Sequence, residues 1–122
     1  MNYGFVKVAA AVPHVQVADC FYNIQQMEGL MRQASDKGVQ IIAFPEMSVT
    51  AYTCLDLFAQ QALLKNAEQA LLKLVSDTAD LNILTIAGAP LVTENRLINA
   101  AVAFQSGKIL GVVPKTYIPN YK

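Results

Sequence analysis

Two short segments that are apolar on both faces constrain the fold of this chain more than any other feature. Residues 5–12 (FVKVAAAV) and 39–44 (VQIIAF) carry apolar side chains at nearly every position, and each segment is followed by a proline. Strands that are apolar on both faces are typical of parallel sheets, which are covered on both sides. Parallel strands need a long crossover connection, which is usually a helix.

The sequence between the two segments has the pattern of an amphipathic helix. Asp19 is a candidate N-cap, and Gly38 lies where a glycine commonly ends a helix. The apolar positions recur at steps of three or four and are Phe21, Ile24, Met27, Leu30, Met31 and Ala34. The rest of the helix surface is expected to carry Asn23, Gln26, Glu28 and Arg32. Strand, helix and strand make a βαβ unit, which predicts an α/β fold.

The second half of the chain predicts another helix and three more strands. Residues 47–58 are expected to form a loop, and a helix is expected over roughly 59–78, with an apolar stripe of Leu64, Ala67, Leu71, Leu74 and Val75. Strands are expected at 81–87, 96–104 and 109–113. The link Gln105-Ser106-Gly107-Lys108 indicates a hairpin. We expect the first three strands to be central and the hairpin to leave one apolar face exposed.

The composition suggests that the segment packs against something further. Of the 122 residues, 54% are hydrophobic and 15% are charged, against about 25% charged in an ordinary soluble domain. Nine basic and nine acidic residues give zero net charge, which disfavours binding to nucleic acid or to an anionic membrane. A small domain buries a limited share of its surface, so we expect part of the apolar surface to face another segment, a second domain or a partner.

The cysteines and the histidine do not form a metal-binding pattern. Cys20, Cys54 and His14 lack the close spacing of zinc ligands. Both cysteines are expected to pack as small apolar side chains; the alternative is a reactive thiol at a helix start (Cys20) or near Glu46 (Cys54). The N-terminus does not resemble a signal peptide, and no apolar run approaches the ~18 residues of a membrane span. We therefore expect a cytoplasmic protein.

Two charged residues follow buried strands across a proline and are the candidate catalytic pair. Glu46 follows Pro45, and Lys115 follows Pro114. Ligands of α/β sheets bind beyond the carboxyl ends of strands. A glutamate there is able to act as a general base, and a lysine is able to stabilise an oxyanion. The alternative is that both are solvated loop charges.

Other ligand motifs are absent or incomplete. No glycine cluster matches a dinucleotide-binding loop, and residues 111–116 (GVVPKT) have the wrong spacing for a phosphate-binding loop. Tyr117 and Tyr121, which follow the last strand, would line a pocket or cover an edge of the core.

The motifs around Glu46 and Lys115 resemble those of the nitrilase, or carbon–nitrogen hydrolase, superfamily. Residues 44–52 (FPEMSVTAY) are similar to its glutamate motif F-P-E-x-x-x-x-G-Y, with Ala51 in place of glycine. Residues 107–117 (GKILGVVPKTY) are similar to its lysine motif. Residues 52–58 (YTCLDLF) and 112–121 (VVPKTYIPNY) further resemble the glutaminase domain of glutamine-dependent NAD synthetases.

This resemblance implies that residues 1–122 are the N-terminal part of a carbon–nitrogen hydrolase (glutaminase) domain. It also implies an α/β fold, a partial αββα four-layer sandwich, to which the segment would contribute two helices and strands of both sheets. It implies a Glu-Lys-Cys triad that hydrolyses the amide of glutamine, with Glu46 as general base and Lys115 stabilising the oxyanion. The nucleophilic cysteine of the family lies beyond residue 122, and Cys54 does not match it. Tyr52 and Tyr121 are implied in substrate binding.

The resemblance also implies partners that this segment does not itself bind. Among such enzymes a synthetase domain uses ATP, magnesium and deamido-NAD, and the protein is expected to be a homo-oligomer; no cofactor is expected within this segment. Two other interpretations remain open. The chain could belong to a stand-alone amidase of the same superfamily, or it could be an inactive folding or interaction module.

Overall fold

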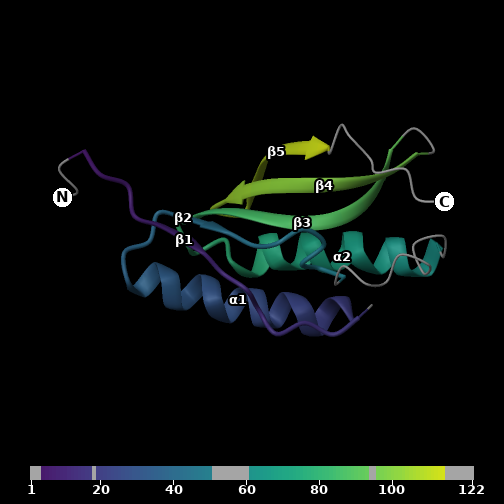
Figure 1. Cartoon of the computed structure of the whole chain (residues 1–122), viewed down its shortest axis with the longest axis horizontal. Helices are drawn as coiled ribbons and strands as arrows, with labels where there is room; N and C mark the ends of the chain where they lie inside the picture. The colour runs from purple at the N-terminus through teal and green to yellow at the C-terminus, as the bar shows by residue number, and fades with distance from the viewer. Residues whose placement is uncertain (1–3, 18, 51–60, 94–95, 115–122) are drawn as a thin grey trace.

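The computed structural model describes residues 4–17, 19–50, 61–93 and 96–114. Its elements, in chain order, are β1 (Val8–Ala10), α1 (Cys20–Asp36), β2 (Ile41–Ala43), α2 (Gln61–Asp77), β3 (Leu84–Thr93), β4 (Arg96–Gln105) and β5 (Lys108–Pro114). The strands form a five-stranded sheet in the order β1-β2-β3-β4-β5. Both helices lie along the same face of this sheet (Figure 1). The fold is therefore α/β, with one helical layer and one sheet layer.

The sheet is parallel in its first half and antiparallel in its second half. β1, β2 and β3 run parallel to one another, which confirms the βαβ prediction. β3 pairs antiparallel with β4, and β4 pairs antiparallel with β5. The expectation that the segment contributes strands to both sheets of the sandwich is wrong for the described residues, because strand pairing runs unbroken from β1 to β5.

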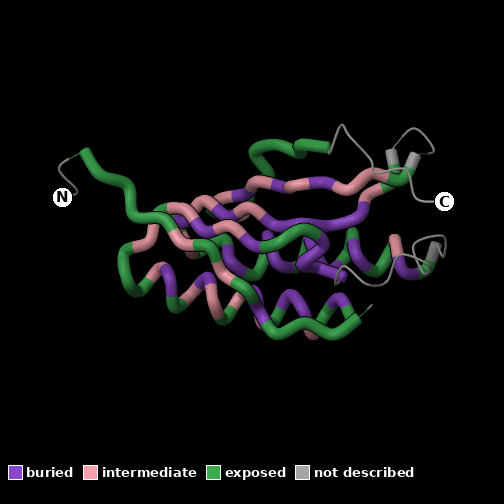
Figure 2. The backbone as a smooth tube through the Cα atoms, in the orientation of Figure 1, coloured by how far each residue is buried: buried purple, intermediate pink, exposed green. Residues whose placement is uncertain are grey.

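The position of the first strand also differs from the prediction. β1 is an edge strand among the described residues, because it pairs with β2 alone. The alternating pattern of Val8, Ala9 and Ala10 leaves the first and third of these side chains exposed. An apolar pattern on both faces shows that a strand is suited to burial. It does not show whether the described residues cover both faces of that strand. Figure 2 shows the exposed stretch at β1 beside the buried middle of the sheet.

Among the described residues, no helix covers one face of the sheet, and that face is mainly apolar. Residues paired directly across strands share a face, so Ala10, Ala43, Ile86, Ala103 and Gly111 form a row across all five strands. These residues are exposed or half-buried, whereas Ile42, Thr85 and Phe104 in the adjacent row, under the helices, are fully buried. We call the first surface the open face. Every residue of β5 is exposed, with Val113 on the open face at 65% and Val112 on the opposite face at 46%. Among the described residues, the hairpin therefore leaves apolar side chains uncovered on both faces of β5, rather than on one face as predicted.

The hairpin between β4 and β5 has the turn that its sequence predicts. Ser106 and Gly107 both have positive φ angles, 52° and 82°. Two successive residues with positive φ are the signature of the type I′ turn, whose twist matches the twist of the flanking strands.

The third strand, β3, differs from its predicted bounds: it begins at Leu84 and continues to Thr93, rather than spanning 81–87. Its extension pairs with β4, and this tertiary contact has no local sequence signal.

Helix α1 begins and ends as predicted, but one polar residue lies in the core. The carboxylate of Asp19 accepts a hydrogen bond from the backbone N–H of Tyr22 at 3.2 Å, and Gly38 has a φ of 77°. Asn23, expected on the polar surface, is fully buried, while Phe21 of the predicted apolar stripe is 40% exposed. The other predicted positions Ile24, Met27, Met31 and Ala34 are buried, so the buried face is the predicted one, with Asn23 in it and Phe21 at its edge.

The burial of Asn23 is compensated by three hydrogen bonds to backbone groups. Its side-chain Nδ2 donates to the carbonyl oxygens of Gln16 (2.8 Å) and Val49 (2.9 Å), and its Oδ1 accepts from the backbone N–H of Gln16 (2.7 Å). A buried amide whose donors and acceptor are satisfied is stable in a core. Asn23 therefore ties the segment before α1 to the loop after β2.

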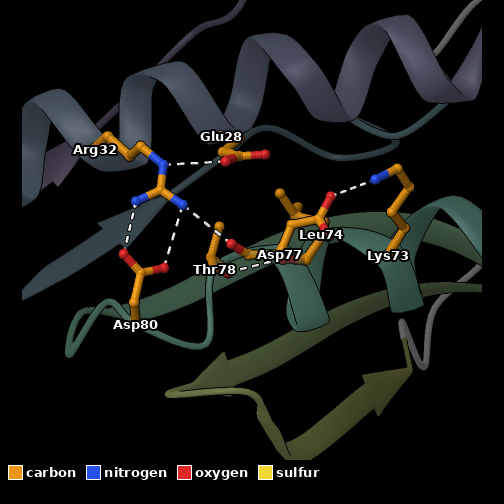
Figure 3. Close-up of polar contacts among 7 residues, drawn as sticks. All are labelled: Glu28, Arg32, Lys73, Leu74, Asp77, Thr78 and Asp80. Atoms are coloured by element: carbon orange, nitrogen blue, oxygen red, sulfur yellow. Dashed lines mark hydrogen bonds and ion pairs between the residues drawn. The ribbon is translucent and has the colours of Figure 1, made fainter.

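Arg32 joins the two helices on the solvent side. Its guanidinium donates to Glu28 one turn earlier in α1, to both carboxylate oxygens of Asp80, and to the backbone carbonyl of Asp77 at the end of α2 (Figure 3). Hydrogen bonding from Arg32 lowers the pKa of Asp80 below its usual value. The pair is exposed, so its contribution to stability is small.

We expect Asn23→Leu to lower the free energy of unfolding by about 2–4 kcal/mol, because it leaves buried backbone groups of Gln16 and Val49 without a partner. Urea unfolding followed by circular dichroism measures this change. The matched control is Gln25→Leu, at an exposed amide of the same helix, which should change stability by less than about 0.5 kcal/mol. Equal effects of the two substitutions would contradict a structural role for Asn23.

We also expect the stabilisation by Arg32 to depend on pH. The folded-state pKa of Asp80 is lowered, so this stabilisation is present above the unfolded-state value, near pH 4, and is lost as the pH falls through the folded-state pKa. Arg32→Gln should therefore lower the urea midpoint at pH 7, and the difference from the unmodified chain should shrink towards pH 2. Lys65→Gln, at an exposed lysine of α2, should show no such trend.

Candidate active site

A pocket of about 250 Å³ lies on the open face, at the carboxyl end of β2. Its walls come from the loop after β2, the first half of β3, the middle of β4 and the end of β5. The lining residues are Phe44, Pro45, Glu46, Ile86, Ala87, Gly88, Asn99, Ala100, Ala101, Val113 and Pro114. Among these residues, Glu46 carries the charge and Asn99 is the other polar side chain. The pocket is thus an apolar hollow with two polar groups at its wall.

Glu46 reaches the pocket because the chain crosses over β3 directly after β2. The crossing is at Gly88, where a Cβ atom would lie 2.5 Å from the backbone nitrogen of Met47 and 2.7 Å from the carbonyl oxygen of Pro45. Real Cβ atoms do not come this close to backbone, so any side chain at this position would push the loop away. A glycine inside a strand often marks such a close approach of another backbone.

Hydrogen bonds on both sides of Glu46 fix this crossing. Before it, the backbone N–H of Phe44 donates to Ile86 at 2.9 Å. After it, the N–H of Val49 donates to the carbonyl oxygen of Gly88 at 3.0 Å, and the hydroxyl of Ser48 accepts from the N–H of Gly88 at 3.1 Å. Ser48 and Val49 are both buried, so these bonds are shielded from water.

The residue next to Glu46 has a strained backbone. Met47 has a φ of 55°, in the left-handed region that a residue with a side chain rarely adopts. Such conformations cost of the order of 1–3 kcal/mol and persist only when the surroundings determine them. Here the surroundings are the buried Met47 side chain and the bonds of Ser48 and Val49 to Gly88. We call residues 44–50, which carry Glu46, the glutamate loop; these contacts hold its backbone in this conformation.

The carboxylate of Glu46 is bridged to β4. The side-chain Nδ2 of Asn99 donates to Oε2 of Glu46 at 3.3 Å. Asn99 lies two residues before Ala101, which pairs with Gly88, so the bond spans β3 on the open face. Its neighbours in the pocket wall are Ala100 and Ala101.

The structure describes one of the four predicted site residues. Glu46 lines the pocket, whereas Lys115, Tyr52 and Tyr121 lie outside the described residues, as does Cys54. Pro114, which precedes Lys115, lines the same pocket as Glu46. Cys20 is 2% exposed and belongs to the core, which confirms its predicted packing role.

Sequence reasoning missed three residues that build this site: Gly88, Ser48 and Asn99. Gly88 and Asn99 each interrupt an apolar strand pattern, and that interruption is the local signal that was available. Ser48 gave no such signal, because serine is common in loops and its partner is 40 positions away.

Within the described ranges, no group of three or more His, Cys, Asp and Glu residues is placed to hold a metal ion. No helix of the described part of the chain is long and apolar enough to cross a membrane.

The relatives found by comparison with known proteins agree with one another on the family of this chain. Residues 7–121 match the carbon–nitrogen hydrolase family. The chain is 39% identical over 121 residues to the glutamine-dependent NAD(+) synthetase of Mycobacterium tuberculosis (strain H37Rv), an alignment that covers 99% of this chain and 18% of that protein. The segment therefore spans less than a fifth of the length of that relative.

Solved structures agree on the fold. A glutamine-dependent NAD(+) synthetase from Cytophaga hutchinsonii superposes with a TM-score of 0.86 at 21% identity, covering 94% of this chain and 20% of that one. An amidase from Nesterenkonia sp. superposes with a TM-score of 0.78 at 18% identity, covering 95% of this chain and 44% of that one. The sheet, the two helices and the glutamate loop are thus an α/β arrangement of the nitrilase type, and this chain belongs to the carbon–nitrogen hydrolase family.

Proposed function

We propose that this segment supplies the general base and the oxyanion-stabilising lysine of a glutaminase, which releases ammonia for the ATP-dependent synthesis of NAD from deamido-NAD. The observation that carries the proposal is the pocket itself. Glu46, carried by a loop whose backbone is hydrogen-bonded to β3, lines it together with Pro114, the residue before Lys115. The 39% identity to a glutamine-dependent NAD(+) synthetase supports glutamine as the amide over other amides.

The proposed reaction needs a nucleophile besides these two residues. A cysteine from beyond residue 122 loses its thiol proton to Glu46 and attacks the amide carbon of glutamine. Lys115 stabilises the negative charge that develops on the amide oxygen. The proton on Glu46 passes to the leaving nitrogen as the C–N bond breaks, and ammonia departs. Water, deprotonated by Glu46, then hydrolyses the thioester to glutamate.

The remaining assignments are part of the same proposal. Tyr52 and Tyr121 bind the glutamine, and ATP, magnesium and deamido-NAD belong to a synthetase domain outside this segment, in a cytoplasmic homo-oligomer.

We expect the 122-residue chain alone to release no ammonia from glutamine. A base and an oxyanion donor cannot form a thioester without a nucleophile. Incubation with glutamine and an ammonia assay test this, with Cys54→Ala as the control. Ammonia release that disappears in Cys54→Ala would make Cys54 the nucleophile and contradict the proposal.

The second test uses a chimera in which residues 1–122 replace the matching segment of the M. tuberculosis synthetase. We expect ammonia release from glutamine, reduced by about 10²–10³-fold or more in Glu46→Gln and Lys115→Ala, because each removes a transition-state contact. Cys54→Ala and Glu28→Gln should retain most of the activity. A soluble chimera that forms NAD from free ammonium but not from glutamine would overturn the proposed function.

A further inference from the structure

We propose that Asn99 is a positioning residue for Glu46: it holds the carboxylate of the general base from the neighbouring strand and so sets the rate of amide hydrolysis without contacting the reacting atoms. This inference rests on the proposed function, because it assigns Glu46 the role of base. It adds a residue whose part in the reaction neither the glutamate motif nor the lysine motif contains.

The placement of Asn99 makes a structural role alone a poor explanation. It lies near the start of β4 on the open face, where the following residues on this face, Ala101 and Ala103, are small and apolar. An amide side chain adds nothing to the packing of such a surface. It does add a donor aimed across β3 at Oε2 of Glu46, at 3.3 Å.

The bridge crosses β3 at a position where no side chain stands in the way. Gly88 has no side chain, and it pairs with Ala101. The glutamate loop crosses above Gly88, within the space that a Cβ atom would fill. The carboxylate on the loop and the amide on β4 therefore approach one another over the smallest residues of the pocket floor.

The chemistry of an amide suits this task. An amide N–H does not titrate, so it donates to an ionised carboxylate without competing for the proton that the base must take. The bond restricts rotation of the carboxylate, and a base must be held within hydrogen-bond reach of its proton. A separation of 3.3 Å lies just beyond the usual 2.7–3.2 Å range. Catalytic hydrogen bonds in structures without substrate are often long and tighten when substrate binds.

The chimera described above tests the rate. Asn99→Leu, which is close in shape to asparagine but cannot donate, should lower kcat about 10–100-fold, because small displacements of a catalytic group have effects of this size. KM for glutamine should change less than about threefold, because the bond is made to the base and not to the substrate. Asn99→Asp should lose at least as much activity, because two carboxylates at this distance repel.

The matched control lies on the same strand. Gln105 is a half-buried amide of β4 whose Nε2 donates to Asn82, far from the pocket lining. Gln105→Leu should leave kcat unchanged. A loss in Gln105→Leu equal to that in Asn99→Leu would show that β4 is merely sensitive to substitution and would overturn the proposal.

A double-substitution cycle separates positioning from direct catalysis. If Asn99 acts through Glu46, then Asn99→Leu should have less than about a twofold effect once Glu46 is glutamine, measured by single-turnover ammonia release. A large further loss in that background, or a rise in KM with kcat unchanged, would mean that Asn99 contacts the substrate. Either result would overturn the positioning role while leaving the proposed function intact.

The contact itself is measurable in the 122-residue chain, whether or not the chimera folds. In ¹⁵N–¹H spectra the side-chain amide of Asn99, identified by its loss in Asn99→Leu, should shift in Glu46→Gln and stay in place in Glu28→Gln. An unshifted Asn99 resonance would overturn the proposal. An active chimera that is indifferent to Asn99→Leu would refute positioning alone, whereas an unmodified chimera unable to use glutamine would refute the proposed function.

Discussion

The approach of the glutamate loop to Gly88 is the constraint on which the rest of this site depends. The loop backbone passes within the volume of a missing Cβ atom, so the carboxylate of Glu46 lies over β3 rather than beyond the end of β2. The strained φ of Met47 and the bonds of Ser48 to Gly88 follow from that path. A loop at ordinary distance from the sheet could not bring Glu46 within reach of Asn99 on β4.

The core and the site are connected through the same loop. Asn23 binds the carbonyl oxygen of Val49, whose own N–H binds Gly88, so α1, the loop and β3 form one chain of hydrogen bonds. Each of these groups is buried, and breaking one bond would leave its partner unsatisfied in the core. These shielded bonds fix the backbone of the glutamate loop, and such preorganisation suits the role proposed for Glu46.

Sequence patterns predicted the features that depend on neighbouring residues. They did not predict the features that depend on contacts between residues far apart in the sequence. The Asp19 cap, the Gly38 ending of α1 and the Ser106–Gly107 turn depend on residues close in sequence, and all are present. The burial of Asn23 depends on a carbonyl 26 positions away, and the site bridge joins residues 53 positions apart. The edge position of β1 depends on which strands pair with it, a property that no pattern within residues 5–12 encodes. For the candidate site, the motif predicted Glu46, while its supports, Gly88 and Asn99, became visible only in three dimensions.

The open face and the pocket are one surface. Ile86, Ala101 and Val113 line the pocket and also belong to the apolar side of the sheet that the helices do not cover. Anything that packs on this side will therefore shape the pocket wall, and by excluding water it will strengthen the interactions of the Glu46 charge. A carboxylate transferred into such surroundings requires hydrogen bonds and a nearby opposite charge. Asn99 supplies a hydrogen bond, and the chain leaves β5 at Pro114, on the pocket wall, with a lysine as its next residue. Covering the sheet and setting the surroundings of the Glu46 carboxylate are thus coupled, because both act on the same few residues.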